Sequence, residues 1–229
     1  MVTRWFIPQR ATLTYGLSSL QGMRHDELRQ LMAVYTKCKP SPKVLDVGCG
    51  KGELLRSLQS YAIELHGCDW LPDLSDSKEV ITFRQTDLNR NGLAGYDDQS
   101  FDVVLCSDVI EHMESPAMLL REISRVLRPD GIAIVSFPNS WNLLERLRFL
   151  FKASFRRFRS ERKSGAWGHI SFFTFEVLES LCDRAHLKIV QLCGGTASGH
   201  MAAAGMFMRI PPTLLLSYNV YVVIEPCKS

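Results

Sequence analysis

One stretch, Lys43-Val-Leu-Asp46-Val-Gly48-Cys-Gly50-Lys-Gly52-Glu53, carries most of the information about the fold. A short apolar run ends here in a glycine-rich loop, and the helical pattern Glu53-Leu-Leu-Arg-Ser-Leu58 follows directly. A strand, a tight glycine loop and a helix in this order are typical of an open α/β sheet. Such a sheet binds its ligand beyond the carboxyl ends of its strands, so we expect the binding site at this loop.

The spacing of the glycines selects the class of ligand. The pattern G-x-G-x-G is complete at Gly48, Gly50 and Gly52. A dinucleotide fingerprint, G-x-G-x-x-G, counted from Gly48 needs a glycine at position 53, where this chain has Glu53. We therefore predict that NAD and NADP do not bind. A glycine backbone has no Cβ atoms, so the loop can still approach an adenosyl-amino-acid closely.

Two further acids follow at the ends of the next apolar runs. Asp69 ends the run Gly67-Cys68-Asp69, nineteen residues after Gly50, and its two oxygens can accept both hydroxyls of a ribose. Asp87 follows the third run, and its carboxylate can accept the amino group of an adenine. Taken singly, each acid can equally cap a loop or a helix. Three acids, at 46, 69 and 87, after one glycine loop make a more specific pattern.

Strands and helices alternate along the rest of the chain. Seven apolar runs predict strands, at 43–48, 61–68, 80–84, 101–106, 131–137, 187–192 and 218–224. Between them, Ser115 with Pro116 begins a helix that Pro129-Asp-Gly131 should end, and Thr174 caps another. Residues 24–35 predict a leading helix. This alternation predicts an α/β fold with a doubly wound, mainly parallel sheet.

Length and composition favour a single domain. The 229 residues are 46% hydrophobic and 22% charged, without repeats or low-complexity tracts. We expect one domain over 1–229: a helical lead-in at 1–42, a cofactor-binding half at 43–137, a basic and aromatic insertion on the acceptor side at 138–173, and a last helix with two strands at 174–229. The seven cysteines form no C-x-x-C pair, which argues against disulfides and a zinc site. We predict no metal and, because the chain starts without a signal peptide, a cytoplasmic location.

These motifs resemble those of class I S-adenosylmethionine-dependent methyltransferases, from about Lys43 to Ile224. The stretch 44–52 resembles their first motif, Phe101–His112 their fourth strand with its loop, and Leu127–Ser136 the turn into the fifth. The resemblance implies a Rossmann-like sheet of seven strands in the order 3-2-1-4-5-7-6, with only strand 7 antiparallel. It also implies S-adenosyl-L-methionine as cofactor and S-adenosyl-L-homocysteine as product.

The motifs give two sets of candidate site residues. The cofactor contacts are expected from Asp46, Gly48, Cys49, Gly50, Gly52, Asp69, Trp70, Asp87, Leu88, Ser107 and His112. The catalytic candidates are His112, Asp108 and His169, since a neutral imidazole near the methyl group can take the proton of a hydroxyl. Alternatives stay open for each: His112 can pack near the adenosine, Asp108 can cap its loop, and His169 can anchor its loop.

Two functions remain open within the superfamily. Ser136-Phe-Pro-Asn139, Trp141 and Gly168-His169 are similar to the branch that contains the methionine-biosynthesis MetW proteins and the ubiquinone-type O-methyltransferases. The Glu111-His112 pair matches the second group better. We therefore expect methyl transfer to a small-molecule acceptor, at oxygen rather than nitrogen or carbon. The alternative is a MetW-like non-catalytic or regulatory subunit with a methyltransferase fold.

The basic residues are concentrated in one segment. Arg146 to Lys163 holds eight Lys and Arg against one acid, Glu161, although the net charge of the whole chain is only +3. Such a local excess argues against a nucleic-acid partner, for which a whole basic face is expected. Leu147, Phe151, Phe155 and Phe158 recur at helical spacing in it. The segment predicts an amphipathic helix that is solvated, contacts an anionic or lipid-linked acceptor, or makes peripheral contact with a membrane. The sequence predicts no oligomeric state.

Overall fold

The computed structural model describes residues 28–33, 39, 41–61, 64–71, 81–154, 168–194, 217 and 219–227. Its centre is one sheet of seven strands in the order β3-β2-β1-β4-β5-β7-β6. β7 is antiparallel to both of its neighbours, and the other pairs are parallel. The predicted topology is confirmed. The strands are β1 (Lys43–Val47), β2 (Glu64–Asp69), β3 (Ile81–Gln85), β4 (Phe101–Ser107), β5 (Leu127–Pro138), β6 (Leu187–Gly194) and β7 (Asn219–Pro226).

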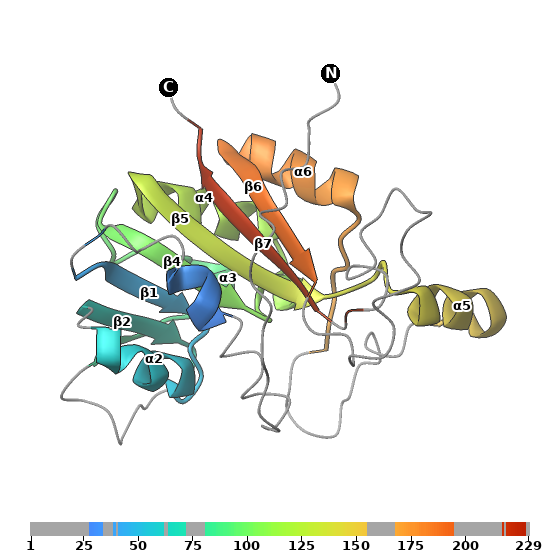
Figure 1. Ribbon diagram of the computed structural model, residues 1–229, viewed down its shortest axis with the longest axis horizontal. Helices are drawn as coiled ribbons and strands as arrows, with labels where there is room; N and C mark the ends of the chain where they lie inside the picture. Colours follow the sequence, from blue (N-terminus) through green and yellow to red (C-terminus); the bar gives the residue numbers. More distant parts are fainter. Residues whose placement is uncertain are drawn as a thin grey trace.

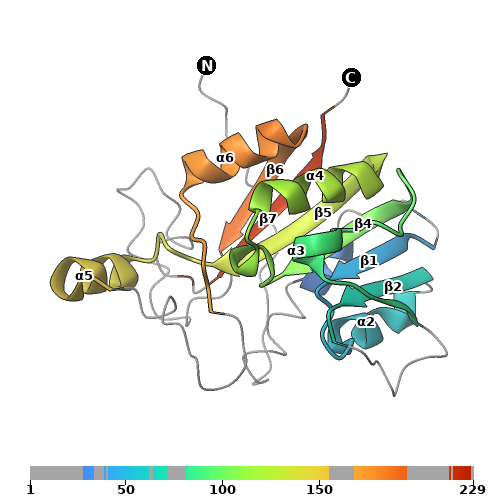
Figure 2. The same cartoon turned by 180° about the vertical axis from the view of Figure 1, so that it is seen from behind.

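Helices cover both faces of the sheet (Figures 1 and 2). The helices of the described chain include α2 (Glu53–Leu58), α3 (Leu88–Asn91), α4 (Pro116–Val126), α5 (Leu143–Lys152) and α6 (Phe175–Arg184), and η1 (Gln59–Tyr61) and η2 (Ile110–His112) are 3-10 turns. Residues 28–33 are also helical, and the rest of the predicted leading helix lies outside the described residues. α2 lies on one face, and α3, α4 and α6 lie on the other.

The two faces of the sheet bury separate apolar clusters. Neighbouring residues of one strand point to opposite faces, so Val104 belongs to the same apolar cluster as Leu120 of α4 and Leu178 of α6. Val103 belongs to the cluster on the other side, together with Leu55 of α2. The central strands β1, β4 and β7 are therefore buried on both faces, which explains why they read as continuous apolar runs in the sequence, whereas the edge strands β3 and β6 are partly exposed.

The predicted helix starts are confirmed. Ser115 Oγ accepts a hydrogen bond from Met118 N at 3.3 Å with Pro116 in the first turn, and Thr174 Oγ1 accepts from Val177 N at 3.3 Å. The start of the fifth strand was predicted wrongly, because β5 begins at Leu127 and not at 131.

The cause of this error is a bulge in β5. Phe101 pairs with Leu127, and the next pair is Val103 with Ile132, so β5 carries extra residues between these two pairs. The segment Pro129-Asp-Gly131 has the composition of a turn. The segment nevertheless lies within β5, between the pairs that Leu127 forms with Phe101 and Ile132 forms with Val103 of β4.

α5 differs from the predicted basic helix. It begins after Asn142, whose Oδ1 accepts from Leu144 N at 2.9 Å, and it ends at Lys152, before Ala153 with a left-handed φ of 47°. A helix that continues unbroken through 146–163 was therefore a wrong prediction, and 155–163 lie outside the described residues. α5 extends away from the sheet in both views (Figures 1 and 2). In the described part of the chain, no helix has both the length and the apolar character needed to cross a bilayer.

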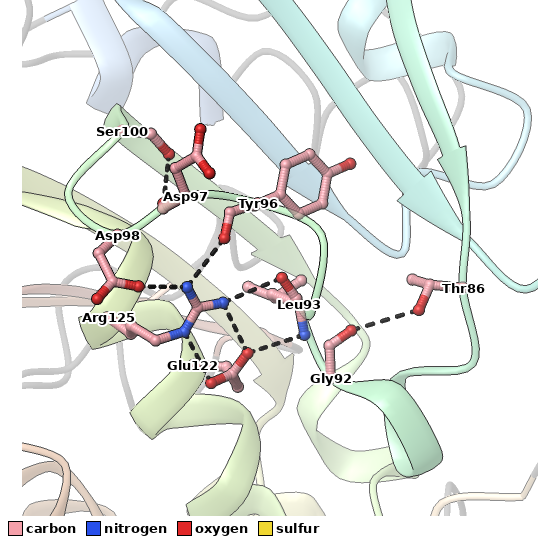
Figure 3. A network of polar contacts seen from close by, with 9 residues as sticks. All are labelled: Thr86, Gly92, Leu93, Tyr96, Asp97, Asp98, Ser100, Glu122 and Arg125. Carbon is pink, nitrogen blue, oxygen red and sulfur yellow. Dashed lines mark hydrogen bonds and ion pairs between the residues drawn. The ribbon is translucent and has the colours of Figure 1, made fainter.

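A polar network joins α4 to the segment between α3 and β4 (Figure 3). The Arg125 guanidinium donates to the carbonyl oxygens of Leu93 at 3.0 Å and Tyr96 at 2.9 Å. It also binds the carboxylates of Asp98 and Glu122, at 2.6 and 2.9 Å. Glu122 in turn accepts from Leu93 N at 3.1 Å. One side chain thus fixes the segment that follows α3.

Candidate functional site

The glycine loop after β1 has the backbone that its sequence predicts. Gly48, Gly50 and Gly52 have φ angles of 72°, 53° and 73°, in the left-handed region that favours glycine. A Cβ atom on Gly48 would collide with Cγ2 of Val109, whereas one on Gly50 would meet nothing within 4 Å. The loop is therefore tightly packed at Gly48 and bordered by open space at Gly50.

Asp69 at the end of β2 fastens this loop. Its Oδ2 accepts a hydrogen bond from Gly50 N at 2.8 Å and its Oδ1 accepts from Leu71 N at 3.0 Å. Gly48 N and Cys49 N both donate to Cys68 O, at 2.8 and 3.1 Å. A carboxylate oxygen has two lone pairs, and the described residues use one on each oxygen of Asp69, so a second acceptor position on each is left for a ligand. The structure thus joins Asp69 to the glycine loop through Gly50, a contact that the sequence analysis did not predict.

Asp46 lies beneath the loop as a buried acid. Only 3% of its surface is exposed, and burial, followed by the nearby charge of Asp69, raises the pKa of Asp46 to about 8. A cation placed beside it would favour the ionised carboxylate again. The glycine backbone, the open space at Gly50 and two acids therefore fit a ligand that carries both a ribose and a positive charge.

The remaining cofactor candidates lie at the ends of β1, β2 and β3. Cys49 is buried in the loop and Trp70 is exposed directly after Asp69. Asp87 caps α3, since its Oδ1 accepts from Asn89 N at 3.0 Å, and Leu88 packs half-buried against the core. The capping alternative considered for Asp87 is thus present in the structure, and a contact with a ligand would come in addition to it.

A second group of polar residues lies at the end of β4. Ser107 Oγ is 2.9 Å from Ser136 Oγ on β5. Asp108 has a left-handed φ of 53°, and its Oδ1 accepts from Asn219 Nδ2 of β7 at 3.2 Å. A residue other than glycine in this conformation is strained, and such strain is concentrated at functional sites. The sequence analysis missed Asn219, whose only signal is an amide at the start of an apolar strand.

His112 and His169 meet next to this strand end. Their ring centroids are 4.8 Å apart in an edge arrangement. His112 Nδ1 lies 3.3 Å from Gly168 O, and Ile170 N donates to Glu111 O at 3.0 Å. The loop before α6 therefore returns to η2, and two candidate bases that are far apart in the sequence share one site.

Glu111 adds a buried carboxylate to the histidine pair. It is 1% exposed, and its Oε1 is 3.9 Å from His169 Nε2. The ligand atoms of Glu111, His112 and His169 all lie within 4.8 Å of one another. One carboxylate with two imidazoles is a donor set that divalent transition metals use, so these three side chains could hold a metal ion. The sequence analysis predicted none and used Glu111-His112 only as a family likeness.

Buried amides fix the chain around the site. Asn139 Nδ2 donates to Ser217 O at 3.0 Å and Asn142 Nδ2 donates to the same oxygen at 2.9 Å. Ser140 Oγ donates to Phe173 O at 2.8 Å. These bonds tie the end of β5 and the start of α5 to the chain that precedes β7 and to the His169 loop. The sequence analysis did not identify them as anchors.

The fold and the site together define a class of protein. A seven-stranded sheet with this order, a G-x-G-x-G loop after β1 and an acid after β2 are the features of the class I S-adenosylmethionine-dependent methyltransferases. A family model described as a methyltransferase domain matches residues 20–192 of the chain. The chain belongs to this family.

Known relatives agree with this assignment. The ubiquinone biosynthesis O-methyltransferase of Actinobacillus pleuropneumoniae serotype 7 (strain AP76) is 32% identical in an alignment of 108 residues that covers 42% of this chain and 46% of the relative. The chain spans about half the length of the curated relatives it matches.

Solved structures share the fold. A SAM-dependent methyltransferase from Archaeoglobus fulgidus superposes with a TM-score of 0.62 at 18% identity, over 89% of this chain and 93% of that one. The cyclase SpnF superposes with a TM-score of 0.63 at 20% identity, over 94% of this chain and 85% of that one. Identities this low show a common fold only.

Proposed function

We propose that the protein binds S-adenosylmethionine at the glycine loop and transfers its methyl group to an oxygen of a small-molecule acceptor. One observation carries the proposal: Asp69 is hydrogen-bonded to Gly50 N, and the buried Asp46 lies beside it. This cradle, formed by the glycine loop with Asp46 and Asp69, lies at the same edge of the sheet as the contact between His112 and His169. A cofactor site and a pair of bases on one edge are the parts that methyl transfer to a hydroxyl requires.

Each acid of the cradle has a role toward the cofactor. Asp69 accepts the ribose hydroxyls with its remaining lone pairs, and Asp46 faces the cationic amino-acid part. Asp87 accepts the adenine amino group while it caps α3. When bound, S-adenosylmethionine supplies a methyl group that is activated by its positively charged sulfur.

The histidine pair supports oxygen as the acceptor atom. A hydroxyl must lose its proton during transfer, and an imidazole can take a proton at neutral pH. His112 and His169 are the bases of the proposal, and Asp108, held by Asn219, orients the acceptor. The curated relatives are named O-methyltransferases, which agrees with this choice of atom.

The test combines an acceptor screen with a cofactor titration. The protein is supplied with S-adenosylmethionine carrying a labelled methyl group and with panels of phenols, alcohols, carboxylic acids and amines. We expect label in a hydroxyl-bearing product. His169→Gln should lower turnover by about 10²–10⁴-fold and leave cofactor affinity within about twofold of wild type.

Variants of Asp69 test the cofactor site separately. Asp69→Ala should weaken binding of S-adenosylmethionine by about 1–3 kcal/mol in calorimetry, because hydrogen-bonding groups lose their partner. Asp183→Ala, an exposed acid on α6, is the matched control and should bind as wild type does. Unchanged affinity of Asp69→Ala would remove this residue from the site and end the proposal.

A non-catalytic role is the second candidate. The fold does not by itself specify methyl transfer, and a cyclase shares it with a TM-score of 0.63. A regulatory subunit would bind S-adenosylmethionine without release of S-adenosylhomocysteine in the presence of any acceptor of the panel. Release that depends on an acceptor would establish the enzyme and exclude the subunit.

A further inference from the structure

α5 presents its apolar side chains to the outside of the protein. None of its residues is buried. Leu143 is 41% exposed, Leu144 63%, Leu147 43%, Leu150 73% and Phe151 79%. The apolar side of a helix on a globular domain normally faces the core. In α5, by contrast, large hydrophobic side chains stand in water.

These five side chains form one stripe. At about 100° per residue, they occupy an arc of about 120° on the helix surface. Arg146 borders the stripe on one side and Arg148 on the other. The only acid of the helix, Glu145, lies on the far side, next to Phe149, which is 49% exposed and outside the stripe. An apolar stripe between arginines is the arrangement of a helix that lies in the surface of a bilayer, where arginine stems cover apolar surface and their heads reach outward.

The charge around the stripe selects the partner. Lys152 ends the helix, and five more basic residues follow in the sequence up to Lys163, with Glu161 as the one acid. Anionic headgroups attract such a segment. A second copy of this chain would place like charges against one another around the stripe, which opposes association. A partner that complements the stripe therefore carries negative charge at its surface and apolar groups below that charge.

α5 starts at the edge of the sheet that carries the site. It follows β5 directly, and Asn142 at its start donates to Ser217 O at 2.9 Å. Figures 1 and 2 show it reaching beyond the end of β5, on the side where the strands end. The helix is thus presented outward by buried hydrogen bonds.

We propose that α5 docks the protein on an anionic lipid surface. Leu144, Leu147, Leu150 and Phe151 enter the region between headgroups and acyl chains, while Arg146 and Arg148 contact lipid phosphates. Ten residues are too few to cross a bilayer, so the helix lies along the surface. This inference goes beyond the proposed function and does not depend on it, since docking requires no methyl transfer.

Co-sedimentation with vesicles tests the proposal. The full chain is mixed with vesicles of phosphatidylcholine alone and with vesicles of phosphatidylcholine and phosphatidylglycerol in equal amounts. We expect binding to the second kind, weakened by salt. Two α5 variants are compared with wild type: Leu150→Gln with Phe151→Gln, and Arg146→Gln with Arg148→Gln. Vesicles supplemented with inorganic phosphate show whether free phosphate competes for the arginines.

Matched control variants replace side chains of the same two kinds, arginine and apolar, on other parts of the surface. Arg121→Gln with Arg184→Gln removes two exposed arginines from α4 and α6, and Val177→Gln replaces a 46% exposed apolar side chain of α6. The arginine pair of α5 should lower the partition coefficient by roughly fivefold per charge. The apolar pair should lower it at least as strongly. The controls should bind as wild type does.

Three results would overturn the proposal. The first is equal partitioning of wild type and both α5 variants. The second is equal binding to neutral and anionic vesicles. The third is a dimer in sedimentation velocity that the α5 variants dissociate, because it would assign the stripe to a second copy. Cofactor binding, measured in the same variants without vesicles, should be unchanged, so failure here leaves the proposed function untouched.

Discussion

Gly48 and Gly50 share a left-handed backbone but differ in what surrounds them. A side chain on Gly48 would collide with Val109, whereas a side chain on Gly50 would enter open space. Glycine at position 48 thus allows tight packing against Val109, whereas glycine at position 50 leaves room for a ligand. Sequence spacing alone does not separate these two roles.

Alanine substitutions separate them. Gly48→Ala should lower the free energy of unfolding by about 2–4 kcal/mol, because backbone strain and overpacking add. Gly50→Ala should lower it by about 1–2 kcal/mol, the cost of the backbone alone. Urea denaturation measures both. Adding Val109→Ala should restore part of the loss in Gly48→Ala only, and an equal effect on both glycine variants would contradict the contact.

Asp46 makes stability depend on pH. Its pKa is about 8 in the folded protein against an ordinary value of 3.8. Between these values the folded state binds one more proton than the unfolded state. The free energy of unfolding should therefore fall as pH rises from about 4 to about 8, by up to about 1.4 kcal/mol per pH unit. Unfolding curves recorded across this range measure the slope.

Asn at position 46 removes the titrating group. Asp46→Asn should flatten the dependence, and Asp183→Asn, at an exposed position of α6, should keep the wild-type slope. Parallel curves for Asp46→Asn and wild type would show that Asp46 is already ionised in the folded protein.

At the scale of elements, connections between helices and strands depend on a few polar residues. Arg125 near the end of α4 binds carbonyls of Leu93 and Tyr96 and the carboxylates of Glu122 and Asp98. These contacts hold the segment that links α3 to β4 (Figure 3). Asp87 caps the start of α3, so the network holds the segment that follows one of the candidate cofactor residues.

Removing Arg125 should loosen this connection. We expect Arg125→Ala to lower the free energy of unfolding by about 1–3 kcal/mol, because carbonyl groups of the segment lose their donor. The guanidinium is 30% exposed, so water replaces part of the loss. Urea denaturation measures the change, with Arg121→Ala on the same helix as an exposed control. Equal stability of the two variants would argue against the network.

At the scale of the whole molecule, the sheet is covered on both faces while α5 lies outside its cores. The residues that stabilise the fold and those that form the α5 stripe are thus separate sets. Leu120 of α4 is completely buried, whereas Leu150 and Phe151 of α5 are 73% and 79% exposed. Stability and surface binding should therefore respond to different substitutions.

Thermal and urea unfolding should show this separation. Leu150→Gln with Phe151→Gln should change the free energy of unfolding by less than about 0.5 kcal/mol, as exposed substitutions do. Leu120→Ala should lower it by about 2–5 kcal/mol through lost burial and a cavity. A large loss in the α5 variant would mean that the stripe packs against the protein itself.

The sequence determined the strands of the sheet and the glycine loop with its neighbouring acids. Apolar runs, the glycine spacing and the caps Ser115 and Thr174 are local patterns, and local backbone preferences set them. Because parallel strands end on one edge, the positions of Asp46 and Asp69 along the chain already placed them together. The order of the strands followed from resemblance to a family that shares these motifs.

The tertiary structure decided the rest. Three features depend on contacts between residues far apart in the chain. They are the ring contact of His112 with His169, the hydrogen bond from Asn219 to Asp108, and the bulge in β5. The outward stripe of α5 is of the same kind, because a helical pattern fixes which residues share a face but not what that face meets. Packing of the whole chain supplies that information.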